Sequence, residues 1–499
     1  MTDQRHGDRA SLEADDLAGP RLAKLDALRE SGVDPYPSGF EATATAAGLA
    51  ESHSGLEPGS VTGELVTVAG RLMGFRDIGK LVFAVLRDGT GDIQLFGDAS
   101  VLGERFDEFG ALDVGDWVGA SGEVMTTRKG ELSVRVADFR LLSKSLRPLP
   151  EKWHGLSDVE TRHRRRYLDL LMSEETREVF RIRSAAVRGL RQAFWDRGFV
   201  EVETPALEHQ PSGAIAKPFL TYHNALDIDM YLRIALELPL KKLVVGGVER
   251  VFEMGRVFRN EGVSTRYNPE FTMLEAYQAF ADYRVVMETV EGVVAEAAVA
   301  ARGTTAMSYQ NQQIDFSPPW ARATFHDLIG EHAGEGFDLG ASLEDLRQRA
   351  DAIGVGVDEA WDQGKILAAV FDATVEKTLI QPTFVTDYPR SLSPFAKDHP
   401  DADGLVERFE AFAGGWEIAN AYSELNDPIE QRARFEGQAA LRAKGDEEAH
   451  GVNEDYLAAL EYGLPPTGGL GIGVDRLIML LADQASIREV ILFPAMRPE

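Results

Sequence analysis

The sequence predicts an α+β fold, in which a small β-barrel precedes a larger domain built on a mostly antiparallel sheet flanked by helices. The chain has 499 residues and is 44% hydrophobic and 9% aromatic, so it is long enough for two or more domains with a large core. Residues 61–142 contain five β-rich runs separated by Gly-rich turns, which is typical of a small barrel. The remainder mixes helical and strand patterns without regular strand–helix–strand alternation, which favours an antiparallel sheet.

The barrel and its flanks define the first half of the domain plan. Five short strands with Gly-rich turns make the OB-fold the leading candidate for the barrel. Before it, Leu22, Leu25 and Leu28 predict one short helix, and 38–60 has the composition of a linker. We expect an N-terminal helical or linker extension over 1–60, the barrel over 61–147, a linker over 148–172 and the large domain over 173–499.

The large domain begins with a well-marked helix. Ser173 precedes two acidic residues, as at a helix start, and Gly198 marks the helix end. A strand then runs into Pro205, which belongs at a strand end or an edge because it has no N–H to donate. Strand-like runs over 256–260 and 270–277 flank a polar loop and predict an antiparallel hairpin. Further helices are predicted over 282–301, 342–353, 364–378, 428–444 and 475–482.

Composition excludes several classes of protein. The chain has no cysteine, so disulfides and Cys-ligated metal sites are excluded. It has no apolar run of 18 residues, so we expect no membrane span. The polar, acidic N-terminus lacks the apolar core of a signal peptide, and a cytoplasmic protein is the simplest interpretation.

The charge distribution leaves the question of a nucleic-acid partner open. A net charge of −29 argues against broad affinity for nucleic acid, because phosphate contacts need Lys and Arg. However, residues 61–150 are nearly neutral, with 11 Lys and Arg against 13 Asp and Glu, and 162–166 is a basic run. A polyanion could therefore bind this half of the chain, and the alternative is an acidic surface with no such partner.

Two Gly-rich segments resemble phosphate-binding loops only superficially. Gly74–Lys80 has the spacing of a P-loop, but Leu81 follows where a Ser or Thr must bind magnesium, and a strand replaces the helix. The segment 468–473 lacks the spacing of a dinucleotide fingerprint. Neither is interpreted as a nucleotide site.

The hairpin over 256–277 carries charges of both signs where an ordinary half-buried strand would carry them on one face. These residues are Arg259, Glu261, Arg266, Glu270 and Glu275. A cleft with both Arg and Glu suits a ligand of both signs, such as a nucleotide together with an amino acid.

Four segments, taken in order, resemble the motifs of class II aminoacyl-tRNA synthetases. They are GFVEVETP at 198–205, FRNEGVSTRYNPEFT at 258–272, GGWEIANAYSELND at 414–427 and GLGIGVDR at 469–476. The finer resemblance is to lysyl-tRNA synthetases, through 223–247, 268–277 and 461–477. It covers about residues 60–499, and the preceding barrel fits the subclass shared with the aspartyl and asparaginyl enzymes.

The resemblance implies that the protein forms lysyl-adenylate from L-lysine and ATP and then transfers lysine to the 3′ end of tRNA(Lys). It implies Arg259 as the catalytic residue that bridges the amino-acid carboxylate and the α-phosphate. The implied ATP-binding residues are Arg259, Glu261, Tyr267, Asn268, Phe271, Glu417 and Arg476. Mg²⁺ is the implied cofactor, with Glu410 and Glu417 as its carboxylate ligands. Tyr267 stands where the family usually has His.

The resemblance also implies the residues that bind lysine and the anticodon. For lysine they are Gly213, Glu237, Glu275, Tyr277, Asn420, Tyr422 and Glu424, with Tyr422 at a position where Phe is common. For the anticodon they are Arg76, Phe83, Gln94 and Glu131. A homodimer is expected, because the segment ending at Pro205 matches the motif that forms the two-fold interface in this class.

Two alternatives are set beside this hypothesis. A paralogue could activate lysine but modify a protein instead of tRNA; such paralogues usually lack the barrel that 61–142 predicts. A non-enzymatic nucleic-acid-binding module would leave Glu237, Arg259, Glu275 and Arg476 without a role.

Overall fold

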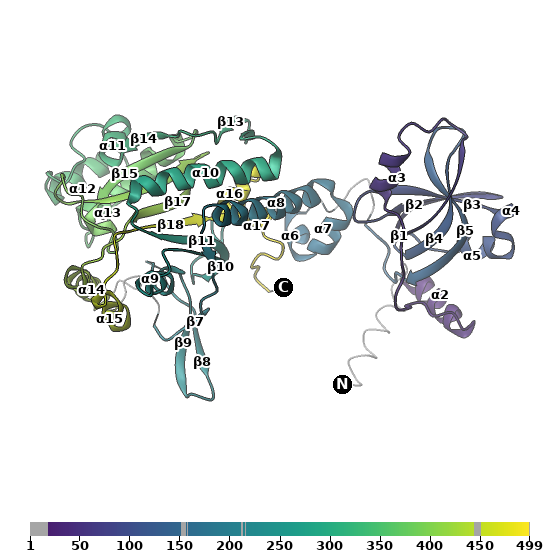
Figure 1. The fold of residues 1–499 in the computed structure, drawn as a ribbon, viewed down its shortest axis with the longest axis horizontal. Helices are drawn as coiled ribbons and strands as arrows, with labels where there is room; N and C mark the ends of the chain where they lie inside the picture. The colour runs from purple at the N-terminus through teal and green to yellow at the C-terminus, as the bar shows by residue number, and fades with distance from the viewer. Residues whose placement is uncertain are drawn as a thin grey trace. The chain divides into compact units, whose positions relative to one another are not determined.

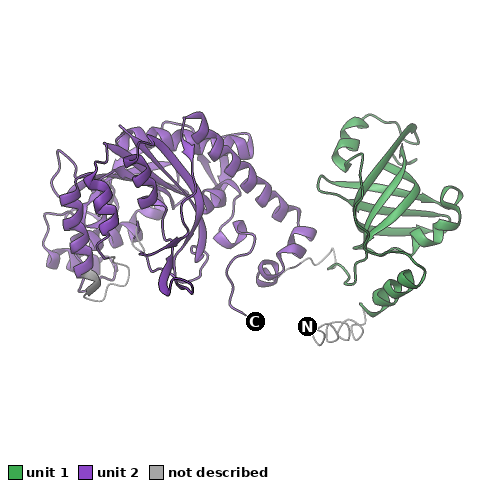
Figure 2. Ribbon diagram, turned by 60° about the horizontal axis from the view of Figure 1, so that its bottom comes forward, with its two compact units in different colours: residues 1–155 green, residues 156–499 purple. Residues whose placement is uncertain are grey.

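The computed structural model describes residues 18–150, 156, 158–210, 213–214, 216–443 and 451–498. The chain forms two compact units, residues 1–155 and 156–499 (Figure 2). Each unit is described by itself.

The first unit is a closed five-stranded barrel in the order β1-β2-β3-β5-β4 (Figure 1). All neighbouring strands are antiparallel except β3 and β5, which are parallel. The strands are β1 (Val61–Ile78), β2 (Leu81–Arg87), β3 (Asp92–Asp98), β4 (Trp117–Thr126) and β5 (Leu132–Ser143). The predicted OB-fold barrel is confirmed.

Alternation along the strands fills this barrel. Val82, Ala84 and Leu86 of β2 are fully buried, while the residues between them are only partly buried. The elements around the barrel are α2 (Gly19–Glu30), α3 (Ala46–Ser52), α4 (Ala99–Leu102), η1 (Gly103–Arg105) and α5 (Phe106–Gly110). Leu22 and Leu25 are buried on α2, which confirms the short helix predicted there.

The linker expected over 38–60 contains α3, so that part of the prediction is wrong. Ala46 and Leu49 of this helix belong to the hydrophobic core of the barrel. Thr45 caps the helix by accepting a hydrogen bond from the N–H of Gly48, and Asp88 accepts one from the N–H of Ala46 at 2.7 Å. An Ala-rich segment has the composition of a linker. A short helix can nevertheless pack with few apolar side chains when the barrel supplies most of the hydrophobic contact.

The second unit is built on one eight-stranded sheet in the order β14-β15-β16-β17-β18-β11-β10-β6. Only the outer pairs β14–β15 and β10–β6 are parallel, so the sheet is mostly antiparallel, as predicted. Its strands are β6 (Val200–Glu201), β10 (Arg250–Phe258), β11 (Glu270–Ala279), β14 (Ala321–Thr324), β15 (Thr383–Pro389), β16 (Leu405–Ala413), β17 (Trp416–Ser423) and β18 (Thr467–Gly473). The smaller strands are β7 (Leu207–Glu208), β8 (Leu220–His223), β9 (Ile228–Leu232), β12 (Ala306–Tyr309) and β13 (Gln312–Asp315).

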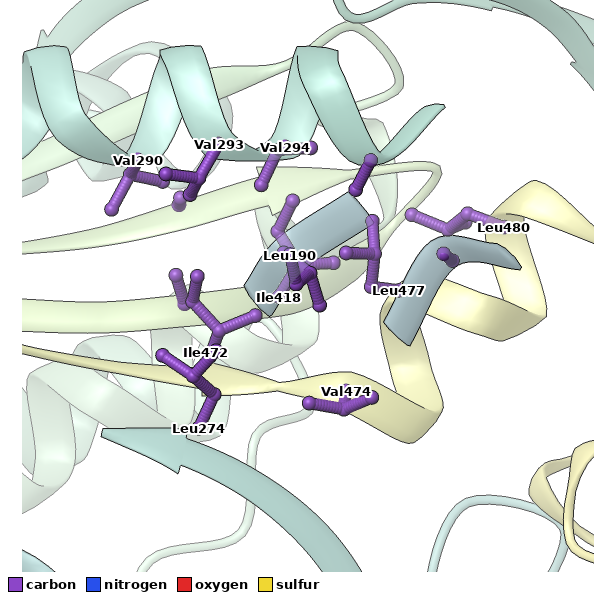
Figure 3. Close-up of a cluster of buried hydrophobic side chains, with 14 of the residues drawn as sticks. Leu190, Leu274, Val290, Val293, Val294, Ile418, Ile472, Val474, Leu477 and Leu480 are labelled. Atoms are coloured by element: carbon purple, nitrogen blue, oxygen red, sulfur yellow. The ribbon is translucent and has the colours of Figure 1, made fainter. Parts of the chain in front are cut away.

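One face of this sheet packs against long helices to form the main core. Figure 3 shows Val290, Val293 and Val294 of the helix α10 above Ile418 and Ile472 of the sheet. The helices of this layer are α8 (Glu174–Asp196), α10 (Tyr283–Arg302), α16 (Val474–Leu481) and α17 (Ile487–Val490). Ser173 caps α8 by accepting a hydrogen bond from the N–H of Thr176, which confirms the predicted helix start.

Two further groups of helices pack around the rest of the sheet. One lies near β15 and consists of α11 (Phe325–Ala333), α12 (Leu343–Ala352), α13 (Gln363–Thr374), η2 (Glu376–Thr378) and η3 (Arg390–Leu392). The other lies near β10 and β11 and consists of α9 (Glu237–Val245), α14 (Pro428–Ala443) and α15 (Glu454–Glu461). The helix predicted over 364–378 ends at Thr374 and continues as the separate turn η2.

Two more helices lie where 148–172 was expected to be a linker: α6 (Val159–Arg164) and α7 (Arg166–Met172). Arg166 is fully buried, pairs with Asp169 at 2.7 Å and donates to the carbonyl oxygens of Arg488 and Leu492. A basic run has no apolar stripe, so the sequence did not predict a packed helix here. The buried guanidinium of Arg166 is tolerated because carboxylate and carbonyl oxygens accept its hydrogen bonds.

The remaining boundaries refine the sequence prediction. The first strand of the hairpin begins at Arg250, six residues before the predicted start. Gly74–Lys80 lies at the end of β1 and in the turn to β2, and 468–473 lies on β18, so neither is a phosphate loop opening a helix. Within the described residues, no helix is long and apolar enough to cross a membrane.

Candidate active site

The glycines of β18 open the sheet for a site on its second face. Leu470 and Ile472 point into the core, while Gly469 and Gly471 alternate with them on the opposite face. A Cβ at Gly469 would lie 2.0 Å from the Glu424 Oε1. The sequence GGLGIG is therefore a strand with side chains on one face only, which leaves room beside β11 and β17.

A pocket with a cavity volume of about 240 Å³ lies over these glycines, and we call it the carboxylate pocket. All of the residues that the resemblance assigned to lysine line it, although they come from four separate stretches of the chain. They are Gly213, Glu237, Glu275, Tyr277, Asn420, Tyr422 and Glu424. Gly213 has φ +87°, and a Cβ there would lie 3.1 Å from the Cβ atoms of Ala235 and Glu237.

Register explains why these residues meet. Glu275 of β11 stands opposite Gly471 of β18, which stands opposite Asn420 of β17. Two residues along, Tyr277 and Tyr422 flank Gly469 in the same way. Each glycine thus lies between two polar side chains of the neighbouring strands. A larger residue in its place would push those two side chains apart.

Three carboxylates are buried in this pocket, and two of them accept hydrogen bonds from protein donors. Glu275 accepts from the Leu236 N–H at 2.9 Å and from the Tyr277 hydroxyl at 3.0 Å. Glu237 accepts from the Tyr422 hydroxyl at 2.8 Å. Glu424 is instead paired with the buried ammonium of Lys241.

Burial raises the pKa of two of these carboxyl groups, those of Glu275 and Glu424. Burial, together with the charge of Glu237, raises the pKa of the Glu275 carboxyl to about 7. Burial raises the pKa of Glu424 well above its usual range, and the ammonium group of Lys241 opposes this rise. A carboxylate in such a place stabilises a cation brought next to it.

Lys241 is the residue of this site that the sequence analysis missed. Its side chain is fully buried on α9, one turn after Glu237, and its ammonium pairs with both Glu237 and Glu424. Burial alone would lower the pKa of Lys241, but the two carboxylates outweigh it and raise the pKa. The i, i+4 spacing of Glu237 and Lys241 was the available signal, but such pairs usually lie on a surface.

A second pocket adjoins the first, and we call it the arginine pocket. It contains every residue that the resemblance assigned to ATP: Arg259, Glu261, Tyr267, Asn268, Phe271, Glu417 and Arg476. Four residues line both pockets: Arg259, Met273, Asn420 and Gly471. Arg259 is the cation at this shared wall.

Arg259 is held in place by the hairpin and by an aromatic ring. Its N–H donates to the carbonyl oxygen of Pro269 at 2.9 Å, and its Nε donates to that of Ile234 at 3.3 Å. The guanidinium lies 5.2 Å from the centre of the Phe271 ring. Burial lowers the pKa of Arg259, which Glu261 and Glu275 oppose, and the group stays cationic.

The residues assigned to magnesium are linked to cations of the same site. Arg476 donates to the Glu417 carboxylate at 2.8 Å. Glu410 accepts from Arg408 at 2.5 Å and from the Tyr388 hydroxyl at 2.9 Å. Burial raises the pKa of Glu410 to about 7, since the charge of Glu417 adds to burial against the effect of Arg408.

This carboxylate pair fits magnesium that is held jointly with phosphate groups. Among the described residues, no group of three or more His, Cys, Asp or Glu side chains could hold a metal ion by itself. Glu410 and Glu417 lie on neighbouring strands, and the charge of Glu417 helps to raise the pKa of Glu410. Magnesium is often bound by one or two carboxylates plus substrate phosphates, which is what this pair offers.

Other residues of the arginine pocket have structural contacts. The Asn268 side chain donates to the carbonyl oxygen of Glu270 and accepts from the N–H of Ala495 at 3.0 Å. Tyr267 is 45% exposed, so its ring is available to a ligand. Trp416, which precedes Glu417 but does not line the pocket, donates from its indole to the Tyr309 hydroxyl at 2.8 Å.

The residues assigned to the anticodon lie on the outside of the barrel. Arg76, Phe83 and Phe96 stand directly opposite one another across β1, β2 and β3. The two Phe rings pack edge to face at 5.3 Å, and both remain partly exposed. Gln94 lies on the same face and accepts from the Ser133 hydroxyl, while Glu131 is exposed just before β5.

Comparison with known proteins identifies the class of both units. Residues 66–142 match the family described as OB-fold nucleic acid binding domain, and residues 158–497 match tRNA synthetases class II (D, K and N). A closed barrel, an antiparallel sheet and two adjoining pockets thus define a class II tRNA synthetase.

Individual relatives narrow the family. The chain is 53% identical to a lysine–tRNA ligase of Moorella thermoacetica over 98% of this chain and 99% of the relative. It is 50% identical to one of Trichormus variabilis (98% and 89%) and 51% identical to one of Parasynechococcus marenigrum (97% and 98%). The chain belongs to the lysine–tRNA ligase family.

Proposed function

We propose that the protein joins L-lysine to tRNA(Lys) in two steps, with lysine in the carboxylate pocket and ATP in the arginine pocket. The observation that carries this proposal is Arg259, a cation at the wall common to both pockets. Two anionic groups that must react, a carboxylate and a phosphate, would meet there.

The first step forms a bond between a carboxylate oxygen of lysine and the α-phosphorus of ATP. The bond from that phosphorus to the oxygen bridging to the β-phosphate breaks, and pyrophosphate leaves. Positioning and charge neutralisation dominate such a transfer. Arg259 can hold both anions with its planar fork of donors. In the second step, a hydroxyl of the terminal tRNA ribose attacks the lysyl carbonyl carbon, and AMP leaves.

Within the arginine pocket, Phe271 would stack on the adenine, and Glu261, Tyr267 and Asn268 would lie along the nucleotide. Arg476 would hold the γ-phosphate once it exchanges its contact with Glu417 for the phosphate. Glu410 and Glu417 would hold Mg²⁺, which supplies positive charge to the phosphate oxygens when bound.

Within the carboxylate pocket, Glu237 and the backbone at Gly213 would hold the α-ammonium of lysine. Glu275, Tyr277 and Glu424 would hold the ε-ammonium at the far end. Asn420 would assist the lysine carboxylate, and Tyr422 would form the wall along the aliphatic stem. Buried carboxylates favour a ligand that brings cations.

The barrel would read the anticodon on its outer face, where Phe83 can stack on a base and Arg76, Gln94 and Glu131 can donate or accept hydrogen bonds. Residues 61–150 are nearly neutral, so this part of the acidic chain repels a polyanion only weakly. The presence of this barrel and the full-length relatives do not favour a paralogue that modifies a protein. We also propose that the enzyme acts in the cytoplasm.

A homodimer is proposed on the basis of exposed apolar side chains around α8 and the strands that follow it. These are Trp195, Val200, Leu207, Leu220 and Tyr222, each between 44% and 62% exposed. Trp195 and Val200 lie in the segment that resembles the interface motif of the class, the other three follow it in the chain, and a second copy would cover them.

The assignment of Arg259 is tested by lysine-dependent ATP–pyrophosphate exchange. We expect Arg259→Ala to lower kcat/KM by about 10²–10³ or more, because a preorganised donor to the reacting anions is lost. The exposed Arg302→Ala serves as the control and should exchange at the wild-type rate. Wild-type exchange should also stop when magnesium is chelated. Exchange with another amino acid but not with lysine would refute the proposed function.

The anticodon face is tested with Phe83→Ala. Loss of one stacked base should weaken the interaction by about 1–3 kcal/mol, and so raise the KM for tRNA(Lys) roughly 5–150-fold. Lysine-dependent exchange without tRNA should not change. Val101→Ala, an exposed residue on α4, is the matched control. An unaltered KM for tRNA in Phe83→Ala would argue against this face.

Sedimentation equilibrium tests the dimer. At micromolar concentration we expect twice the 54.8 kDa mass of one chain. Introducing charge with Val200→Glu should shift the mass toward the monomer, since an unpaired charge is costly in an apolar interface. A wild-type protein that sediments as a monomer would contradict the proposal.

A further inference from the structure

A buried ammonium group, that of Lys241, lies behind the carboxylate pocket. Lys241 does not line the pocket; it lies behind Glu237 and Glu424 with no exposed side-chain surface. Its ammonium lies between both carboxylates, which belong to different parts of the chain. A buried lysine needs such partners, but it is an unusual choice beneath a site that must itself attract a cation.

Aromatic rings complete the surroundings of this ammonium. It lies 4.8 Å from the ring centre of Phe395, 5.5 Å from that of Tyr422, and 5.7 Å from that of Tyr456. Rings at these distances stabilise a desolvated cation. Lys241 is therefore held as a cation by carboxylates and by aromatic faces together.

The charges of the other ionisable groups around the pocket are compensated by groups other than Lys241. Arg408 pairs with Glu410, and Arg259 faces the anions of the two substrates. Burial raises the pKa of Glu208 to about 8, so this neighbour of Glu275 is mostly uncharged at pH 7. The titratable groups that face the carboxylates are Glu237 and Lys241 of α9, Glu275 and Tyr277 of β11, Tyr422 of β17, Glu424, which follows it, and Tyr456 of α15.

We propose that Lys241 is a specificity-determining positioning residue: it balances one of the three pocket carboxylates, so that Glu237, Glu275 and Glu424 together accept two substrate ammonium groups. Lysine brings two such groups, one at each end of its stem. This inference rests on the proposed binding of lysine in this pocket. Without Lys241 no resident cation would face the three carboxylates, so one of them would hold a proton in the empty pocket, and the ammonium groups of an incoming lysine would have to displace it.

The test compares the KM for lysine as a function of pH in wild-type enzyme and in Lys241→Met, by ATP–pyrophosphate exchange at saturating ATP. Between pH 7.5 and 8.5 the wild-type KM should be nearly constant, because Glu275 is then largely ionised. The variant must lose a proton for each lysine bound, so its KM should fall about tenfold per pH unit. At pH 7.5 its KM should be raised roughly 10–100-fold, with the KM for ATP unchanged.

Two further variants make the result decisive. Lys242→Met removes the neighbouring lysine, which pairs with Asp455 at the surface, and should behave as wild type. Lys241→Met combined with Glu424→Gln removes the buried pair together, which is tolerated better than removing one partner. This double variant should lose the pH dependence of the single variant even though it binds lysine weakly.

A merely structural role for Lys241 predicts different data. It predicts that Lys241→Met lowers kcat and thermal stability with no new pH dependence in the KM for lysine, and this result would overturn the proposal. If the single variant does not fold, a double variant whose KM still falls tenfold per pH unit would overturn it equally. Absence of lysine-dependent exchange in the wild type would instead refute the proposed function and is measured first.

Discussion

The structure of the site depends on the burial of three carboxylates in one pocket. An ionised carboxylate is costly to bury without a cation, and Glu237, Glu275 and Glu424 are each at most 5% exposed. Lys241 supplies one cation from within the protein. The geometry of α9, which places Lys241 one turn after Glu237, therefore determines how much positive charge a ligand must bring.

The hairpin of β10 and β11 connects this charge to the chemistry. Glu275 and Tyr277 lie at the end of β11 that borders the carboxylate pocket, while Phe271 lies at the other end beside the arginine pocket. Arg259, just after β10, reaches the wall between the two pockets. The alternation of glycine with Leu470 and Ile472 on the neighbouring β18 makes room for both ligands while the same strand holds the core.

Local patterns predicted much of this arrangement, because their physical causes are local. The cap at Ser173, the end of α8 before Gly198 and the hairpin follow from short-range preferences, and the resemblance brought distant segments into one site. Lys241 and the helix α3 could not be found in this way. Each is defined by partners far away in sequence, Glu424 in one case and the barrel core in the other. A buried ion pair and a surface ion pair look alike in a sequence. A packed Ala-rich helix such as α3 and an Ala-rich linker also look alike.

The charge of the pocket selects the substrate, and replacing only the charge at the far end of lysine tests this selection most directly. Exchange measured with norleucine, which keeps the aliphatic stem but lacks the ε-ammonium, should fall in kcat/KM by roughly 10⁴–10⁵ relative to lysine, because it leaves buried polar groups unpaired. Ornithine, one methylene shorter, should fall only by roughly 10–200-fold. Norleucine exchanging within about a hundredfold of lysine would show that the carboxylates do not select the ligand by charge.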